Sequence, residues 1–494
     1  MAEALTISEN TDLSPLGEEP GPAAAGSPGY HILTWGCQMN EEDSEQISLY
    51  LEGMGYHATA ATDQAEVVLL NTCSVRAKPE EKVWSELGKL RELKRDRPNM
   101  IIGVCGCMAQ VESKEIQKRA PHVDLVVGTG NIAALPDLIT QIKVNGKIVR
   151  EALEEQPKFK RIHSAALTSL DLPPRKGAIV TDIPLRRTER TPKLKAHVPI
   201  MYGCDKFCTF CIVPYTRGRE RSRPTDEILR EIESLATNGT REVTLLGQTV
   251  NSYGKNLAEG RVPFCDLLEQ IAAIRGISRI RFTSPYPRDF TDDLIDTIGR
   301  LDKVCEHVHL PLQVADDDLL AEMHRGYTVS EFQTIVDKLR DRVPGLAITT
   351  DVMLGYPGET EAQFRNTMRF IEQTRFDSAF MFAYSPRPNT KAALREDQLP
   401  QSVKIERLSE LIAVQNGITV EINRSLVGSV FEVLVEGRSP KDDSRLTGYT
   451  RTFKAVNFTV SETGPRSADS LIGKTVPVRA IESHLTGFTG EYAG

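Results

Sequence analysis

Short apolar runs alternate with amphipathic segments along most of this 494-residue chain, and this alternation constrains the fold more than any other feature. In the first region, the expected strands are residues 32–35, 66–71, 100–104 and 124–127. The expected helices are residues 41–54, 79–95, 113–120 and 132–142, with Asn40 as the cap of the first. Continuous apolar strands separated by helices are typical of a parallel, doubly wound α/β sheet.

The alternation resumes further along the chain. We expect strands at residues 197–202, 242–246, 279–283, 308–312, 347–353 and 378–383. We expect helices at residues 226–236, 265–274, 292–298, 330–340 and 361–374. These six strand–helix units are fewer than the eight of a closed barrel. After an amphipathic helix at 401–416, the short runs 429–435, 453–460 and 475–481 predict a small all-β barrel.

Length and composition suggest a soluble protein of about three domains. We divide it into a disordered tail (1–28), an α/β domain (29–147), a proline-containing linker (148–195), a second α/β domain (196–423) and a β domain (424–494). The apolar runs are too short to cross a membrane, and the tail lacks the pattern of a secretory signal. Nine cysteines in such a chain point to the reducing cytoplasm. The net charge of −8 means that any nucleic acid contact needs a local basic patch.

Three cysteines, Cys204, Cys208 and Cys211, lie close together in one loop. Three thiols cannot pair evenly as disulfides, and three thiolates make an incomplete metal site. An iron–sulfur cube has four irons and takes thiolate ligands, so a cube held here leaves one iron open for a substrate. The alternative is a structural zinc site, which needs a fourth Cys or His nearby. The candidates for that fourth ligand are His197, Cys265 and His307.

A second set of three cysteines is spread along the first region. Cys37 follows the first predicted strand, Cys73 the second and Cys107 the third. The carboxyl ends of parallel strands lie along one edge of a sheet, so we expect these thiols to converge in a second three-thiolate site. The alternative is three unrelated buried cysteines, which behave as small hydrophobes. Cys105 is expected to be a packing residue of this kind.

Taken together, these motifs resemble those of the radical S-adenosylmethionine methylthiotransferase family. The resemblance is carried by the loop Gly203–Cys211 and by the motifs Trp35–Asn40, Asn71–Arg76 and Gly106–Gln110. It implies a radical-generating 4Fe-4S cluster on Cys204, Cys208 and Cys211, whose open iron chelates S-adenosylmethionine. It implies an auxiliary 4Fe-4S cluster on Cys37, Cys73 and Cys107. It also implies that residues 196–423 form a partial barrel of six strand–helix units and that residues 29–147 are an N-terminal methylthiotransferase domain.

Other strand-end segments match the tRNA-modifying branch of the family, most closely at residues 247–254 and 282–289. From this resemblance we expect S-adenosylmethionine contacts at Phe210, Gly247, Gln248, Asp351 and Gly355. We expect substrate contacts at Arg217, Arg219, Asn251 and Arg451. The chain departs from the family at Gln313–Asp316, where small polar contacts to the cofactor are lost or replaced by Asp316.

Two basic stretches leave alternatives open. The arginines of residues 216–223 pair well with carboxylate or phosphate, so they hold a cofactor carboxylate, tRNA phosphates or neighbouring acidic side chains. The basic end of the linker, 186–195, is either a solvated charge run or a contact with an RNA backbone. The pieces 435–437 and 448–451 resemble the TRAM domain, an RNA-binding β-barrel. Tyr449 stands there in place of an arginine and can stack on a base, and a purely structural barrel is the alternative.

The resemblance covers residues 30–494 and implies addition of a methylthio group to carbon 2 of N6-isopentenyladenosine at position 37 of tRNA, with two S-adenosylmethionine molecules per turnover. The implied partners are the tRNA anticodon stem-loop, a low-potential electron donor of the flavodoxin or ferredoxin type and a sulfur donor. We expect a cytoplasmic monomer without membrane association. The alternatives are sister enzymes acting on threonylcarbamoyladenosine in tRNA or on a ribosomal-protein aspartate, and an iron–sulfur RNA-binding protein without turnover. Formation of deoxyadenosine on reduction with S-adenosylmethionine distinguishes an enzyme from a binder.

Overall fold

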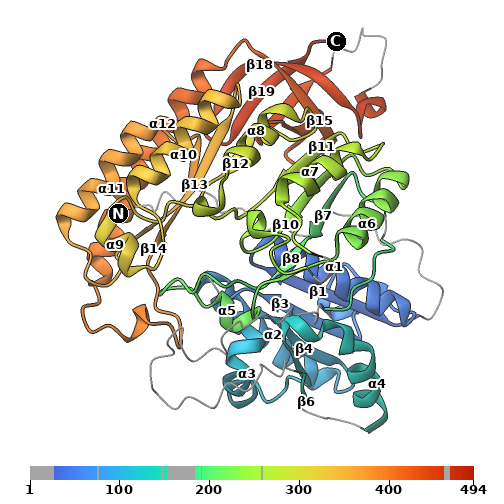
Figure 1. Cartoon of the computed structure of the whole chain (residues 1–494). Helices are drawn as coiled ribbons and strands as arrows, with labels where there is room; N and C mark the ends of the chain where they lie inside the picture. Colours follow the sequence, from blue (N-terminus) through green and yellow to red (C-terminus); the bar gives the residue numbers. More distant parts are fainter. Residues whose placement is uncertain are drawn as a thin grey trace.

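The computed structural model describes residues 27–74, 77–145, 150–152, 184–190, 192–257, 260–460 and 468–494. Three regions follow one another, coloured blue to teal, green to orange, and red in Figure 1. Residues 1–26 of the predicted tail and most of the predicted linker lie outside the described residues. Within the described ranges, no helix is long and apolar enough to cross a membrane.

The first region is a six-stranded parallel sheet, and the predicted doubly wound fold is confirmed. The strand order is β2-β1-β3-β4-β5-β6. The strands are β1 (Gly29–Trp35), β2 (His57–Ala58), β3 (Val67–Thr72), β4 (Ile101–Gly106), β5 (Leu125–Val127) and β6 (Arg150–Ala152). Every residue of β3 and β4 is buried, which explains their continuous apolar sequence.

Helices cover both faces of this sheet. On one face, α1 (Gln38–Gly53) and α4 (Leu135–Asn145) contribute to one hydrophobic cluster. On the other face, α2 (Ala77–Asp96) and α3 (Cys107–Arg119) contribute to a second cluster. The strand order changes direction around β1 and β3, so ligands are expected beyond the carboxyl ends of these strands.

The central region contains the six predicted parallel strands as two sheets of three, β11-β10-β7 and β12-β13-β14. The strands are β7 (Lys195–Pro199), β10 (Glu242–Leu246), β11 (Arg279–Phe282), β12 (His307–His309), β13 (Ala347–Leu354) and β14 (Ser378–Ala383). A parallel bridge between Ile280 and Val304 joins β11 to the segment before β12. The two halves therefore form an incomplete barrel.

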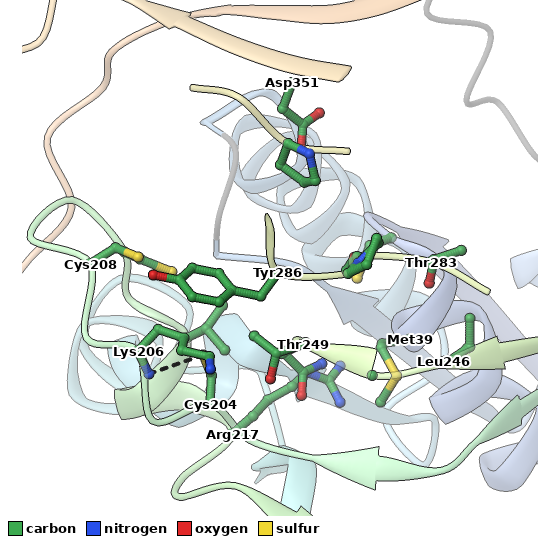
Figure 2. A pocket seen from close by; sticks show the side chains of 18 of the residues that line it. Met39, Cys204, Lys206, Cys208, Arg217, Leu246, Thr249, Thr283, Tyr286 and Asp351 are labelled. Carbon is green, nitrogen blue, oxygen red and sulfur yellow. Dashed lines mark hydrogen bonds between the residues drawn. The ribbon is translucent and has the colours of Figure 1, made fainter. Parts of the chain in front are cut away.

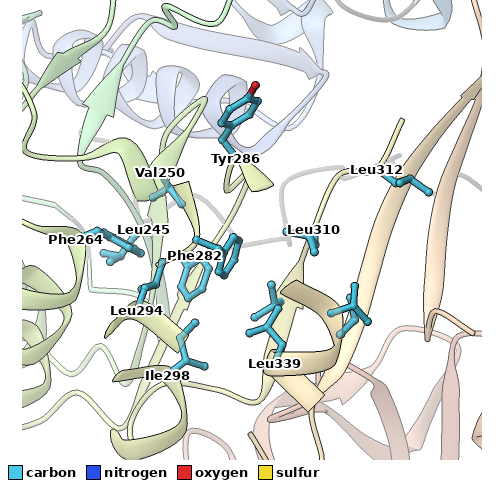
Figure 3. Packing of buried hydrophobic residues seen from close by; sticks show 14 of the residues in the cluster. Leu245, Val250, Phe264, Phe282, Tyr286, Leu294, Ile298, Leu310, Leu312 and Leu339 are labelled. Atoms are coloured by element: carbon cyan, nitrogen blue, oxygen red, sulfur yellow. The ribbon is translucent and has the colours of Figure 1, made fainter. Parts of the chain in front are cut away.

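The helices of the central region cover the outer side of these strands. They are α6 (Thr225–Thr237), α7 (Phe264–Ala273), α8 (Asp292–Arg300), α9 (Asp317–Glu322), α10 (Val329–Arg342) and α11 (Glu361–Thr374). Figure 3 shows part of the shared core, with Phe264 against Phe282 in one half and Leu310, Leu312 and Leu339 in the other. The shorter elements β8 (Met201–Tyr202), α5 (Val213–Thr216) and β9 (Arg221–Ser222) surround the loop that carries Cys204–Cys211.

The C-terminal region is a closed five-stranded barrel, as predicted, with strand order β15-β16-β17-β19-β18. It follows α12 (Gln401–Ser425), which extends nine residues beyond the predicted end of this helix. The strands are β15 (Val430–Ser439), β16 (Asp442–Thr450), β17 (Ala455–Thr459), β18 (Thr475–His484) and β19 (Gly487–Tyr492). The apolar pattern missed β16 and β19, because β16 is mostly polar and β19 contains two glycines.

The barrel docks onto the amino ends of the central strands through buried arginines. Arg279 donates to the carbonyl oxygens of Tyr449 and Glu432 at 2.8 and 3.0 Å. Arg281 donates to the carbonyl oxygens of Thr450 and Arg451, both at 2.8 Å. The cysteine loop follows the opposite, carboxyl ends of these strands. The C-terminal barrel and the cysteine loop therefore lie at opposite ends of the half-barrel.

Two arginines at the basic end of the linker, Arg186 and Arg190, face neither solvent nor a surface open to RNA. Arg186 and Arg190 are buried and both contact Glu231 of α6. Arg186 also pairs with Glu42 of α1 at 2.6 Å, and Arg223 approaches Glu231 at 2.8 Å. The two acidic partners come from different regions, which is why the linker sequence alone did not reveal this cluster.

His197 on β7 gives this part of the fold a pH dependence. Its Nδ1 lies 3.5 Å from Glu41 of α1, but burial and the charges of Lys195, Arg190 and Lys193 lower the pKa of His197 to about 4. Between pH 6.5 and pH 4 the unfolded chain therefore binds a proton that the folded chain does not. We expect the free energy of unfolding to fall as the pH falls through this window.

The measurement is urea unfolding at a series of pH values for the wild type and His197→Gln. The variant is expected to lose part of the pH dependence, whereas His484→Gln, at an exposed position on β18, retains it. Equal pH dependence in all three proteins would contradict the lowered pKa of His197.

Candidate active site

Both sets of cysteines line the same cavity, which has a volume of about 270 Å³ and lies where the first region meets the central region (Figure 2). Cys37 is the N-cap of α1, Cys73 follows β3, and Cys107 is the first residue of α3. Cys204, Cys208 and Cys211 come from the loop between β8 and α5. The thiols of Cys37, Cys73 and Cys107, which are far apart in sequence, thus lie together at the ends of neighbouring strands. Their role as cluster ligands stays a prediction.

Glycines permit the close approach of the three strand ends. Gly36 precedes Cys37 with φ +143°, and a Cβ built on it would lie 2.6 Å from the Cβ of Cys73. Gly106 precedes Cys107 with φ +89°, and a Cβ there would lie 2.3 Å from Oδ1 of Asn71. Both positions combine a backbone conformation that favours glycine with a space that only glycine leaves open.

Gly106→Ala is expected to displace Cys107 and, if the three cysteines Cys37, Cys73 and Cys107 hold the predicted auxiliary cluster, to remove it while leaving the cluster predicted at the other set in place. The iron content after anaerobic reconstitution should then fall from about eight to about four per chain. The matched control is Gly55→Ala, because Gly55 has φ +88° but no atom within 4 Å of the added Cβ. Equal iron content in the two variants would show that crowding at Gly106 does not matter.

A buried polar network braces the first cysteine. The sequence predicts Asn40 as the cap of α1, but the helix begins earlier and Cys37 is the N-cap. Asn40 is instead buried in the first turn and accepts a hydrogen bond from Cys37 Sγ at 3.2 Å. Asn71 at the end of β3 donates to the Asn40 carbonyl and to Ser44 Oγ, both at 2.8 Å. Asn71 therefore joins the end of β3 to the start of α1, and no local pattern could show that.

Arg217 brings positive charge to the first set of thiols. It is buried, lines the cavity and pairs with Asp43 of α1 at 2.6 Å. A hydrogen bond with Cys73 and the charge of Arg217 lower the pKa of Cys37 to about 5. The sequence left a cofactor carboxylate, tRNA phosphates and acidic side chains open as partners for the arginines of residues 216–223. For Arg217 the structure shows an acidic side chain, Asp43. The predicted contact of Arg217 with the substrate stays a prediction.

The second set of thiols has a different environment. Burial raises the pKa of Cys211 to about 12 and that of Cys204 well above its usual value. A thiol of this kind becomes a thiolate when a metal ion replaces its proton. Within the described residues, no three His, Cys, Asp or Glu side chains are placed to hold a single metal ion. A cubane cluster binds each thiolate through a different iron, so the donor sets fit a 4Fe-4S cluster better than zinc.

Arg325 is a cavity residue that the sequence did not reveal. Its Nη1 donates to Cys208 Sγ at 3.4 Å, and its Nη2 donates to the Pro311 carbonyl at 3.3 Å. Its Nε donates to the Tyr327 hydroxyl at 3.1 Å, and its guanidinium also lies over the ring of Tyr286. The arginine is buried and held from several sides, so it can fix the position of the Cys208 sulfur.

Lys206 is a second cationic residue of the cavity wall that was not among the predicted site residues. It lies inside the cysteine loop, pairs with Asp289 at 2.6 Å and has its ammonium group over the ring of Tyr286. Its place between two cysteines was visible in the sequence, but its partner Asp289 is 83 residues away. The cavity thus carries two cations in addition to Arg217.

The structure places the remaining predicted residues in two groups. The cavity wall includes Phe210, Gly247, Gln248 and Asp351. The residues outside the cavity wall are Gly355, Arg219, Asn251 and Arg451. Their contacts are with the protein, and their predicted ligand contacts stay predictions.

Each residue of this second group has a clear partner. The Gly355 amide donates to Glu359 Oε2 at 2.8 Å. Asn251 Nδ2 donates to the Tyr286 carbonyl at 3.0 Å. Arg451 pairs with Glu306 at 2.7 Å, and Arg219 approaches Asp205 at 3.4 Å.

The structure gives the Asp316 carboxylate partners within the protein. It is the N-cap of α9, where its side chain accepts from the Leu319 amide at 3.2 Å. Gln363 and Asn366 of α11 donate to the same carboxylate. Asp316 is not part of the cavity wall, whereas Gln313 of the same segment is.

Comparisons with known proteins agree with this architecture. The model described as "Uncharacterized protein family UPF0004" matches residues 29–128. The radical SAM superfamily model matches residues 198–371, and the TRAM domain model matches residues 424–491. Among solved structures, the radical S-adenosylmethionine methyltransferase TsrM from Kitasatospora setae has a TM-score of 0.50 and 14% identity, over 82% of this chain and 80% of that chain. This likeness concerns the fold alone.

Curated relatives are similar over almost the whole chain. The tRNA-2-methylthio-N(6)-dimethylallyladenosine synthase of Carboxydothermus hydrogenoformans is 44% identical over 463 residues, which is 93% of this chain and 98% of that protein. The synthase of the same name from Moorella thermoacetica is 44% identical over 94% of this chain and 98% of its own length. The one from Alkaliphilus oremlandii is 45% identical over 94% and 92%. With its radical SAM and TRAM regions, the chain belongs to the family of tRNA-2-methylthio-N(6)-dimethylallyladenosine synthases.

Proposed function

We propose that this enzyme adds a methylthio group to carbon 2 of N6-isopentenyladenosine at position 37 of tRNA. The observation that carries this proposal is the convergence of two three-cysteine sets on one cavity. An aromatic C–H has no proton that a side-chain base removes at neutral pH, so radical chemistry is needed. The choice of substrate rests on the names of the curated relatives, which specify a 2-methylthio-N(6)-dimethylallyladenosine in tRNA.

In this proposal, Cys204, Cys208 and Cys211 hold the cluster that binds S-adenosylmethionine. When bound, that cofactor would supply a 5′-deoxyadenosyl radical, and a second molecule would supply the methyl group. Cys37, Cys73 and Cys107 hold the auxiliary cluster, which is the source of sulfur. The protein contributes the positions of these groups and keeps them apart from solvent.

The cavity wall divides into polar and apolar parts. Gln248 and Asp351 offer hydrogen-bonding groups to a cofactor, and Lys206 and Arg325 offer positive charge to its carboxylate. Met39 and Leu246 belong to a small apolar cluster with Tyr202 and form an apolar part of the wall. This arrangement suits a polar cofactor that must meet an apolar reacting carbon.

The further partners follow from the same proposal. The C-terminal barrel, whose family binds RNA, contacts the tRNA together with the central region. The reaction requires a low-potential electron donor of the flavodoxin or ferredoxin type and a sulfur donor that rebuilds the auxiliary cluster. We propose that the enzyme works in the cytoplasm as a monomer and contacts no membrane.

Iron and sulfide analysis after anaerobic reconstitution tests the proposal, using the wild type and a Cys204/Cys208/Cys211 triple alanine variant. We expect about eight irons in the wild type and about four in the variant. The wild type should also methylthiolate isopentenylated tRNA and leave threonylcarbamoylated tRNA unchanged. Four irons in the wild type and none in the variant would remove the auxiliary cluster and with it this function.

A further inference from the structure

One face of the sheet β12-β13-β14 points into the interior of the incomplete barrel and is partly open. Along β13, Ile348 and Val352 are buried in the core, whereas Thr349 and Asp351 on the opposite face are partly exposed. Phe380 of β14 is in register with Asp351 and shares its face. Its side chain is 55% exposed. A closed barrel fills this space with packed side chains, so an uncovered phenylalanine here requires an explanation.

A series of rings continues from Phe380 toward the C-terminal barrel. Phe380 lies edge to face against His309, with ring centroids 5.7 Å apart. The Thr349 hydroxyl is hydrogen-bonded to both His309 Nδ1 and His307 Nε2, at 3.0 and 3.2 Å. The ring of His307 is stacked on Phe453, with centroids 5.3 Å apart. Figure 1 shows this sheet between the first region at one end and the C-terminal barrel at the other.

Phe453 has two unusual properties. Its backbone has φ +63°, which is unfavourable for a residue with a side chain, and its ring is 44% exposed. Tyr449 stacks on it at 5.2 Å, and the Arg281 guanidinium lies 5.0 Å from its centroid. Phe453 lies in the turn between β16 and β17, and protein groups already pack against its ring.

The series of rings begins at the cysteine cavity. His309 Nε2 lies 3.3 Å from Asp351 Oδ2, and Asp351 is part of the cavity wall. Burial and the charge of Arg281 lower the pKa of His307 well below its usual value, so its ring is neutral at pH 7. The face therefore offers flat rings separated by hydrogen-bonding groups, and it is continuous with the site where the reacting adenosine is proposed to bind.

We propose that Phe380 is a stacking platform for an unpaired base of the RNA loop beside the reacting adenosine. This inference rests on the proposed function, which brings that loop to the cavity. Unpaired loop bases are recognised by stacking on aromatic side chains and by hydrogen bonds to their edges. The ring of Phe380 supplies the first, and Thr349 and Asp351, which are partly exposed on the same face, carry oxygen atoms for the second. A purely aliphatic ligand could contact the rings but would leave the hydrogen-bonding groups of this face unused, so an RNA loop fits the face better.

The test is the affinity of the reconstituted full-length enzyme for an isopentenylated anticodon stem-loop RNA. Loss of one base–aromatic stack weakens binding by about 5- to 150-fold, so we expect Phe380→Ala to raise Kd within this range. Phe380→Trp is expected to bind like the wild type because it keeps an aromatic face. The matched control is Ile405→Ala on α12, which removes a side chain with similar exposure of 52% and should leave Kd unchanged.

A second RNA separates stacking from a general loss of structure. An RNA with an abasic site beside the reacting adenosine should bind the wild type more weakly, and Phe380→Ala should weaken it little further. Wild-type affinity in Phe380→Ala, or additive effects of the abasic site and the variant, would overturn the stacking proposal. If the wild type methylthiolates tRNA in either case, the proposed function stands. If it binds RNA but forms no methylthiolated product, the proposed function fails instead.

Discussion

Glu231→Gln is expected to destabilise the folded enzyme strongly. The Glu231 side chain is fully buried and contacts Arg186, Arg190 and Arg223. Burial by itself would raise the pKa of Glu231, but the three arginines lower it to about 2. Glutamine would leave three buried guanidinium groups with one negative charge fewer. Removing one partner of a buried ion pair costs about 3–5 kcal/mol of the free energy of unfolding.

Two measurements apply to this variant. Urea unfolding gives the overall change, and hydrogen exchange in α1 and α6 gives the free energy of local opening at the cluster. Glu233→Gln is the matched control because Glu233 lies on the same helix but is exposed, and we expect a change within about 0.5 kcal/mol. If both variants unfold alike, the buried cluster does not hold the linker between the first and central regions.

Arg325→Gln is expected to have the largest effect on the chemistry. The guanidinium of Arg325 donates a hydrogen bond to Cys208 Sγ and brings a positive charge to the proposed radical-generating cluster. Hydrogen bonds to cluster sulfurs and nearby positive charge stabilise the reduced state. We therefore expect a lower reduction potential in the variant and slower cleavage of S-adenosylmethionine, by about 10- to 100-fold.

The potential is measured by a redox titration followed by electron paramagnetic resonance, and cleavage by deoxyadenosine formation. Arg325→Lys keeps the charge but loses the planar fork, so its potential should lie between those of the wild type and Arg325→Gln. Arg369→Gln on the exposed side of α11 is the control for loss of an arginine far from the cavity. An unchanged potential in Arg325→Gln would show that this hydrogen bond does not influence the cluster.

The sequence was sufficient to predict the architecture for a physical reason. A strand buried on both faces must be apolar throughout, as β3 and β4 are, and a helix that covers a sheet must be amphipathic. Regular alternation of the two permits few parallel folds. The same reasoning predicted that Cys37, Cys73 and Cys107 meet at one edge, because the carboxyl ends of parallel strands lie together.

The limits of sequence reasoning are equally specific. The boundary of α1 was misplaced because Asn40 has the properties of a helix cap but is used in a hydrogen-bond network with Asn71. The strand β16 was missed because only one of its faces is buried and its exposed residues are polar.

Local sequence therefore determined the elements, their order and the two cysteine sets, since these depend on which side chains avoid water and on where the thiols fall relative to the strand ends. Only the tertiary structure showed that Arg186 and Arg190 are buried against Glu231, that Arg325 reaches Cys208, and that Phe380 remains exposed inside the half-barrel. Each of these depends on partners from other elements or on a space left unfilled between two sheets. Contacts over such separations arise from packing of the whole chain, and no local pattern specifies them.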